Sequence, residues 1–236
     1  MSTTELHPSK LGTKEHWDDV YEEELRTFEE IGEEGEIWFG EESIEKMVEW
    51  SLENFPPAPD RSILEVGSGN GTLLFGLLEA GYDPKMLHGI DYSAGAVTLA
   101  KGIAAKKERG LEITFTRCDF LQEDPQRPGI RSADTISTEV WDFLMDKGTY
   151  DAIALGQRDE NGNSPAVHYP GRVSRLLKSG GFFLITSCNF TEEELKANFT
   201  GDSGAGLIYH SRIQHPTFTF AGKSGSVCSS VAFRKK

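Results

Sequence analysis

Apolar residues occur along this chain in two patterns, short continuous runs and helical spacing, and the alternation of these patterns predicts an α/β fold. Short apolar runs that predict strands cover residues 62–66, 87–90, 113–117, 141–145, 182–186, 208–213 and 227–233. Apolar positions three and four residues apart predict helices over residues 14–30, 43–54, 73–80, 94–109 and 167–177, the last bent at Pro170. Strands alternate with helices until the last two strands. We therefore expect a Rossmann-like, doubly wound, mostly parallel seven-stranded sheet with an antiparallel C-terminal edge.

Other stretches of the sequence refine this outline. Thr191 and Glu194 have the spacing of a helix-capping box, which predicts another helix after the fifth strand. Residues 123–138 are rich in proline, glycine, serine and charge, so we expect a surface excursion there. No apolar run reaches membrane-spanning length, and the polar N-terminal residues do not have the pattern of a signal peptide. A cytoplasmic or nuclear location is expected.

Composition narrows the kind of partner. The 236 residues include 38 Asp and Glu against 24 Lys and Arg, a net charge of −14. This charge repels phosphates, which disfavours a nucleic-acid partner, and it attracts a basic protein; an acidity that serves only solubility is the alternative. Cys118, Cys188 and Cys228 lie far apart and no histidines have ligand spacing, so neither a disulfide framework nor a metal site is expected. We expect a monomer.

A glycine-rich turn follows the first strand and opens a helix. In a doubly wound sheet this turn lies where ligands bind, and glycine lets the backbone approach them closely. A dinucleotide fingerprint needs glycine at position 72, which is Thr72, and Glu65 is unfavourable beside a pyrophosphate. The turn favours a cationic ligand with an amino-acid moiety, such as a sulfonium; alternatively, Glu65 only pins the turn. The cofactor-binding candidates here are Glu65, Gly67, Ser68, Gly69, Asn70 and Gly71.

Acidic residues also end the second and third strands. Asp91 lies 20 residues after the last glycine of the turn, the spacing at which a carboxylate accepts ribose hydroxyls. Tyr92 is expected to pack under the ribose or to cap the next helix. Asp119, between Cys118 and Phe120, is expected to accept from an adenine amino group while Phe120 packs near the ring; a turn role is the alternative. Together with the glycine turn, these strand ends predict binding of S-adenosylmethionine (AdoMet).

Longer strings carry a family resemblance that runs from Leu11 to Phe233. They are residues 12–17 (GTKEHW), 36–43 (EIWFGEES), 64–71 (LEVGSGNG), 89–93 (GIDYS), 118–120 (CDF), 146–153 (DKGTYDAI), 181–189 (GFFLITSCN) and 218–225 (FTFAGKSG). The chain resembles class I methyltransferases, and among them those that methylate a lysine of translation elongation factor 1-alpha. The resemblance implies AdoMet as methyl donor, a lysine ε-amine as acceptor, a cytoplasmic location and no metal. It is accompanied by a predicted division into residues 1–40, part of a substrate and cofactor lid, and a methyltransferase domain over residues 41–236.

Four residues are assigned to the acceptor side of the site. By the resemblance, Trp38 and Phe39 wall a channel for the lysine; otherwise they anchor the N-terminal segment to the core. Asp146, at the end of the fourth strand, is expected to orient the ε-amine or take its proton, or else to be a turn carboxylate. Asn189 is expected to line the acceptor cleft or to cap a turn. Lys147 is expected to be structural, because a cation near a sulfonium is unfavourable.

The sequence therefore predicts a protein-lysine N-methyltransferase whose substrate is elongation factor 1-alpha. Transfer requires a neutral lysine amine, and an apolar channel favours that form. Two alternatives stay open at this point. One is a small-molecule methyltransferase, and the other is an AdoMet-binding protein without activity.

Overall fold

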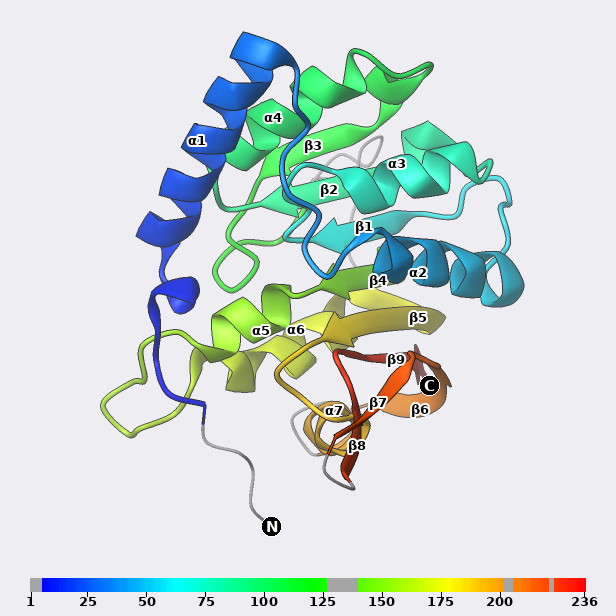
Figure 1. Cartoon of the computed structure of the whole chain (residues 1–236). Coiled ribbons are helices and arrows are strands. Elements are labelled where there is room, and N and C mark those ends of the chain that lie inside the picture. Colours follow the sequence, from blue (N-terminus) through cyan, green and yellow to red (C-terminus); the bar gives the residue numbers. More distant parts are fainter. Residues whose placement is uncertain (1–5, 127–139, 202–205, 221–222) are drawn as a thin grey trace.

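The strand order of the central sheet places the glycine turn near its middle. The computed structural model describes residues 6–126, 140–201, 206–220 and 223–236. Within these ranges a seven-stranded sheet has the order β3-β2-β1-β4-β5-β9-β6 (Figure 1). Its strands are β1 (Ile63–Val66), β2 (Leu87–Asp91), β3 (Thr114–Arg117), β4 (Trp141–Lys147), β5 (Leu177–Ser187), β6 (Leu207–Ile213) and β9 (Ser229–Lys235).

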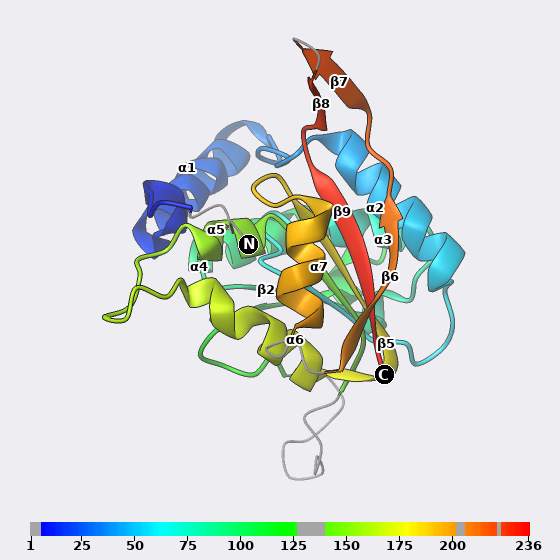
Figure 2. The same ribbon diagram turned by 90° about the horizontal axis from the view of Figure 1, so that it is seen from below.

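The strand directions confirm the predicted fold class. Strands β3, β2, β1, β4 and β5 run parallel to one another, whereas β9 lies between β5 and β6 and is antiparallel to both. A separate antiparallel hairpin of β7 (Thr217–Phe220) and β8 (Lys223–Ser226) connects β6 to β9 and projects beyond the sheet (Figure 2). The parallel strands direct their carboxyl ends to one edge, where the predicted site residues lie.

Helices cover both faces of the sheet and give two hydrophobic cores. Alternate strand residues point to opposite faces, so Ile63 belongs to one core and Leu64 to the other. The helices α1 (Lys14–Ile31), α2 (Glu41–Asn54), α3 (Thr72–Glu79) and α4 (Ala94–Ala104) pack in the first core. The helices α5 (Thr149–Ala154), α6 (Tyr169–Leu176) and α7 (Glu192–Thr200) pack in the second.

Several local features differ from the sequence predictions. Helix α4 ends at Ala104 instead of 109, and Pro170 lies in the first turn of α6 and does not bend a longer helix. Helix α5 was not predicted, because its six residues are too few to show a period. The capping box at Thr191 is confirmed, with both of its hydrogen bonds present. Most of the expected surface excursion, residues 127–139, lies outside the described residues.

Candidate active site

The turn between β1 and α3 needs glycine at positions 67 and 69. Gly67 has a φ of 64°, and a Cβ there would lie 1.9 Å from Oγ1 of Thr149. Gly69 has a φ of 52°, and a Cβ there would lie 2.4 Å from the Tyr21 hydroxyl oxygen. Both positions therefore combine a left-handed backbone with close neighbours, which L side chains do not tolerate. The backbone N–H of Ser68 donates to the carbonyl of Ile90 at 2.9 Å and fixes the turn against β2.

Asp91 ends β2 beside this turn with half of its acceptor capacity in use. Its Oδ2 accepts from the Gly69 N–H at 3.1 Å and its Oδ1 from the Ser93 N–H at 2.9 Å. A carboxylate has about four lone-pair sites, so two more donors can be accepted. Burial raises the pKa of Asp91 to about 6, although the hydrogen bonds from Ser93 and Gly69 oppose the shift. The group is thus placed to receive a pair of hydroxyls.

The end of β3 lies next to Asp91. The N–H of Cys118 donates to the Asp91 carbonyl at 2.9 Å, which holds the two strand ends together. Asp119 accepts from the Leu121 N–H at 3.0 Å through Oδ1 only, so its other oxygen has no described hydrogen bond. The Phe120 ring packs on Tyr169 with ring centroids 4.9 Å apart. The acid and the aromatic ring therefore line one end of the site.

A cavity of about 280 Å³ lies over these strand ends. It brings together most of the residues that the sequence nominated. From the cofactor side these are Gly67, Ser68, Gly69, Asn70, Asp91, Tyr92, Cys118, Asp119 and Phe120, and from the acceptor side Trp38, Phe39 and Asn189. Three nominated residues do not line it: Glu65, Gly71 and Asp146.

Glu65 and Gly71 are buried and do not line the cavity. Glu65 is 2% exposed, and its Oε2 has no hydrogen-bond partner among the described residues. Burial raises the pKa of Glu65 to about 8, while the positive charge of Lys147 opposes the shift. Gly71 has a φ of 83°, and a Cβ there would lie 2.8 Å from the Phe115 ring. Their predicted direct contact with a cofactor is not part of this geometry.

Asp146, which the sequence nominated for the acceptor side, does not line the cavity. Its side chain is fully buried and accepts from the Thr149 N–H at 2.9 Å, the Tyr150 N–H at 3.0 Å and the Tyr169 hydroxyl. These bonds place the carboxylate at the N-terminus of α5, where the helix dipole also favours negative charge. Asp146 therefore positions α5 and its neighbours, as the alternative turn role anticipated.

Trp38 and Phe39 form one wall of the cavity. Phe39 has a φ of 68°, a left-handed conformation that is strained for a bulky residue. Its ring packs on the backbone of Gly148, where a Cβ would meet the ring at 3.0 Å. Trp38 packs edge-on against Trp17 with centroids 5.0 Å apart, and its Nε1 is buried without a described hydrogen bond. The wall is thus attached to the core and also faces the cavity.

N-terminal residues also line the cavity. From the sequence, residues 1–40 were assigned to a lid, but no cavity residue before Trp38 was named. Leu11, Gly12, Trp17 and Tyr21 line the cavity, and the Trp17 Nε1 donates to the Leu11 carbonyl at 2.7 Å. The signal was the string of residues 12–17 in the family resemblance. The Asn70 amide also donates to the Glu34 carbonyl at 3.0 Å. This bond ties the segment after α1 directly to the glycine turn.

Residues at the end of β4 and in α5 were missed as site residues. Lys147, Thr149 and Asp151 all line the cavity. The Asp151 Oδ2 accepts from the Cys188 N–H at 2.7 Å, which fixes the turn that carries Asn189. Asp151 lies in the short helix α5, which was not predicted; the signal for these residues was the string of residues 146–153 in the family resemblance.

The described residues fit AdoMet. Gly67 and Gly69 keep the turn free of Cβ atoms, Asp91 keeps two acceptor sites, and the buried Ser68 hydroxyl has no described partner. In the described part of the chain, no group of three or more His, Cys, Asp or Glu side chains is arranged to hold a metal ion.

Among the same residues, no helix has the length and apolar character to cross a membrane.

Comparison with known proteins agrees with this geometry. Residues 58–222 match a family model described as a methyltransferase domain. The chain is 39% identical to protein-lysine N-methyltransferase efm4 of Schizosaccharomyces pombe, covering 97% of this chain and 95% of that protein. It is 40% identical to EEF1A lysine methyltransferase 2 of Homo sapiens, covering 97% and 88% of the two chains. It is 37% identical to protein-lysine N-methyltransferase EFM4 of Saccharomyces cerevisiae, covering 100% and 99%.

Solved structures share the fold at low sequence identity. The N-methyltransferase NodS of Bradyrhizobium japonicum, solved with S-adenosyl-L-homocysteine, superposes with a TM-score of 0.60 at 16% identity, covering 93% of this chain and 98% of that one. The glycopeptide N-methyltransferase MtfA, solved with sinefungin, superposes with a TM-score of 0.57 at 12% identity, covering 84% and 95%. These similarities support the Rossmann-like architecture.

Proposed function

This chain belongs to the AdoMet-dependent protein-lysine N-methyltransferases, and from that premise we propose that it methylates a lysine of translation elongation factor 1-alpha. One observation carries the proposal: relatives named for this activity or this substrate are 37–40% identical over nearly the whole chain. Identity of this extent includes the N-terminal segment that encloses the cavity as well as the methyltransferase domain.

The strand ends of β2 and β3 would hold the adenosine part of AdoMet. Asp91 has two unused acceptor sites for the two ribose hydroxyls, and Tyr92 lies beside it in the cavity wall. Asp119 has an oxygen without a described partner for the adenine amino group, and Phe120 offers a ring to pack on the base. The glycine turn would let the chain approach the remainder of the cofactor.

Trp38, Phe39 and Asn189 would form the acceptor channel. When bound, AdoMet supplies a methyl group to the lone pair of a neutral ε-amine and keeps the electron pair of the broken C–S bond. The aromatic rings exclude water and so favour the neutral amine, whose ordinary pKa is about 10.4. Their faces also attract a methylammonium product. Alignment of the reactants can supply about 7–11 kcal/mol, so no strong base is needed, and none is assigned.

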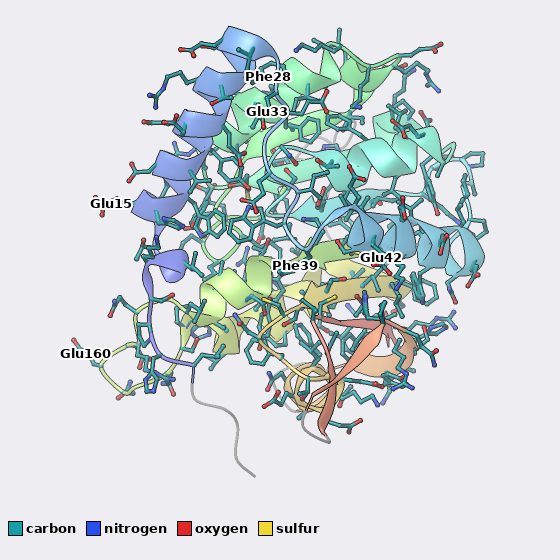
Figure 3. All side chains as sticks on the ribbon, viewed as in Figure 1. Glu15, Phe28, Glu33, Phe39, Glu42 and Glu160 are labelled. Atoms are coloured by element: carbon teal, nitrogen blue, oxygen red, sulfur yellow. The ribbon has the colours of Figure 1, made fainter. Side chains whose placement is uncertain are left out.

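A basic segment of the substrate protein fits the charge around the channel. Residues 14–54 contain sixteen Asp and Glu against three Lys and Arg, which is nearly all of the excess negative charge of the chain. Glu33, Glu34, Glu41 and Glu42 are exposed on either side of the channel wall. Figure 3 shows Glu33 on the loop after α1 and Glu42 on α2, with Phe39 beside Glu42 and below Glu33 in that view. Charge of this kind steers basic partners toward the site.

The proposal also covers the roles of two segments of the chain, its oligomeric state and its location. We infer that residues 1–40 act as part of a lid and residues 41–236 as the methyltransferase domain. We also infer a monomer in the cytoplasm, with entry to the nucleus as a second location, and no nucleic-acid partner. The net charge of −14 supports the last point, because it opposes the approach of a phosphate backbone.

The test is transfer of a labelled methyl group to purified elongation factor 1-alpha. Methyl-labelled AdoMet, the purified chain and the factor should yield one labelled protein, with the label on a lysine when peptides are analysed by mass spectrometry. A factor in which that lysine is replaced by arginine should take up no label. Label confined to small solutes of a lysate would favour a small-molecule methyltransferase. Cofactor binding without any transfer would favour a non-catalytic protein.

A further inference from the structure

Lys147 is the one lysine or arginine among the residues that line the cavity, all of which lie in the described part of the chain. The other charged lining residues are acidic: Glu36, Asp91, Asp119 and Asp151. A ligand whose charged groups include a carboxylate would meet repulsion at four positions and attraction at one. The expectation that Lys147 is merely structural does not account for its place in the cavity wall.

The ammonium group of Lys147 has unused donors. Its Nζ donates to the Trp38 carbonyl at 3.2 Å, and two of its three N–H groups have no described partner. Among the residues that the structure describes, no carboxylate lies within 4.0 Å of it. Burial lowers the pKa of Lys147, and the negative charges of Glu65 and Asp146 oppose the shift. The Oε2 of Glu65, whose charge acts on Lys147, is buried without a hydrogen bond to any described residue.

The order of the strands assigns a direction to the ligand. In the sequence β3-β2-β1-β4, Asp119 and Asp91 stand at the ends of β3 and β2, the glycine turn follows β1, and Lys147 ends β4 (Figure 1). An adenosyl group bound by the two aspartates would therefore extend its sulfur substituents across the glycine turn toward β4. The amino-acid moiety of the cofactor would arrive next to Lys147.

We propose that Lys147 binds the α-carboxylate of the amino-acid moiety of AdoMet. This proposal rests on AdoMet use under the proposed function. The carboxylate also resolves the objection to a cation near a sulfonium, because it stands between the two positive charges and attracts both. Lys147 is accordingly a specificity-determining residue for the cofactor.

The experiment compares two ligands that differ only in the carboxylate. Dissociation constants are measured by calorimetry for S-adenosylhomocysteine and for its decarboxylated analogue, in which hydrogen replaces the carboxyl group. The wild-type chain should prefer S-adenosylhomocysteine, and Lys147→Met should weaken its binding about 10- to 100-fold, the range for a hydrogen bond between charged groups. Binding of the decarboxylated analogue should change less than threefold. The ratio within each variant cancels any effect of the substitution on folding.

Two further variants sharpen the comparison. Lys147→Arg should recover most of the preference, because guanidinium also pairs with carboxylates. Lys85→Met removes the same charge from a side chain that is 68% exposed, and it should leave both constants unchanged. The proposal is overturned if Lys147→Met weakens both ligands equally, or if it keeps the wild-type ratio because backbone amides of the turn hold the carboxylate. A wild-type chain that binds neither ligand would instead overturn AdoMet use itself.

Discussion

If Asp91 binds the ribose hydroxyls, the affinity for the cofactor should fall as this carboxylate becomes protonated. Burial raises the pKa of Asp91 to about 6, above its ordinary value of 3.8. Ribose hydroxyls donate hydrogen bonds, so they favour the ionised carboxylate and should lower its pKa in the complex. Binding must therefore select the ionised form, which is nearly the whole population at pH 7.5 and about one tenth of it at pH 5.

The magnitude follows from that population. Between pH 7 and pH 5, the dissociation constant of S-adenosylhomocysteine for the wild-type chain should rise about tenfold. Asp91→Asn keeps one acceptor oxygen and removes the charge. It should weaken binding about 10- to 100-fold at pH 7.5, as expected for the loss of a hydrogen bond to a charged group. The variant should also show little of the tenfold change with pH, because its side chain does not titrate.

Calorimetry from pH 5 to pH 8 is the assay, and two buffers of different ionisation enthalpy report the proton released on binding near pH 6. Thermal unfolding of the ligand-free variant checks that it is folded. A wild-type affinity that is constant over this range would refute the reasoning. So would an Asp91→Asn variant with the same pH dependence as the wild type, since another group would then be titrating.

Three other predictions concern the turn, α5 and the acidic surface. Gly67→Ala should abolish measurable cofactor binding, because its Cβ would lie 1.9 Å from the Thr149 hydroxyl. The control is Gly81→Ala, where φ is 92° and the space around the new Cβ is open, so that only backbone strain is added; this variant should bind the cofactor normally in the same titration. Asp146→Ala should lower the melting temperature by about 6–12 °C, because about 3 kcal/mol is lost when two N–H groups and the Tyr169 hydroxyl lose their acceptor; slower transfer at an unchanged melting temperature would return Asp146 to the reacting centre. The KM for the protein substrate should rise several-fold between roughly 50 and 300 mM salt, because the Debye length shortens over this range, and the affinity for the cofactor should stay constant. A KM that does not depend on salt would show that the acidic face does not steer the substrate.

Local sequence determined the elements that carry the cofactor side of the site. Short apolar runs located every strand of the central sheet in the described residues, because inner strands such as β1 and β2 are buried on both faces. The glycine turn, Asp91 and Asp119 could be nominated because parallel strands present their carboxyl ends at one edge. The chemistry of this side therefore followed from strand ends and their spacing.

The acceptor side was decided by tertiary contacts. Asp146 and Lys147 are adjacent in sequence, yet consecutive strand residues point to opposite sides, so only Lys147 reaches the cavity while Asp146 caps α5. The sequence alone does not show which of these two side chains faces the cavity, because that depends on the register of β4 against β1. Tyr21 likewise came to the glycine turn only through the packing of α1.

What the sequence by itself determined is thus the α/β architecture and the adenosine end of the pocket, because local patterns and strand termini define them. What only the tertiary structure decided is which charged side chains enter the cavity and how far the N-terminal segment encloses it. Those outcomes depend on side-chain direction and on contacts between residues far apart in the chain, such as the Lys147 ammonium and the Trp38 carbonyl. Such contacts leave no periodic pattern in the sequence.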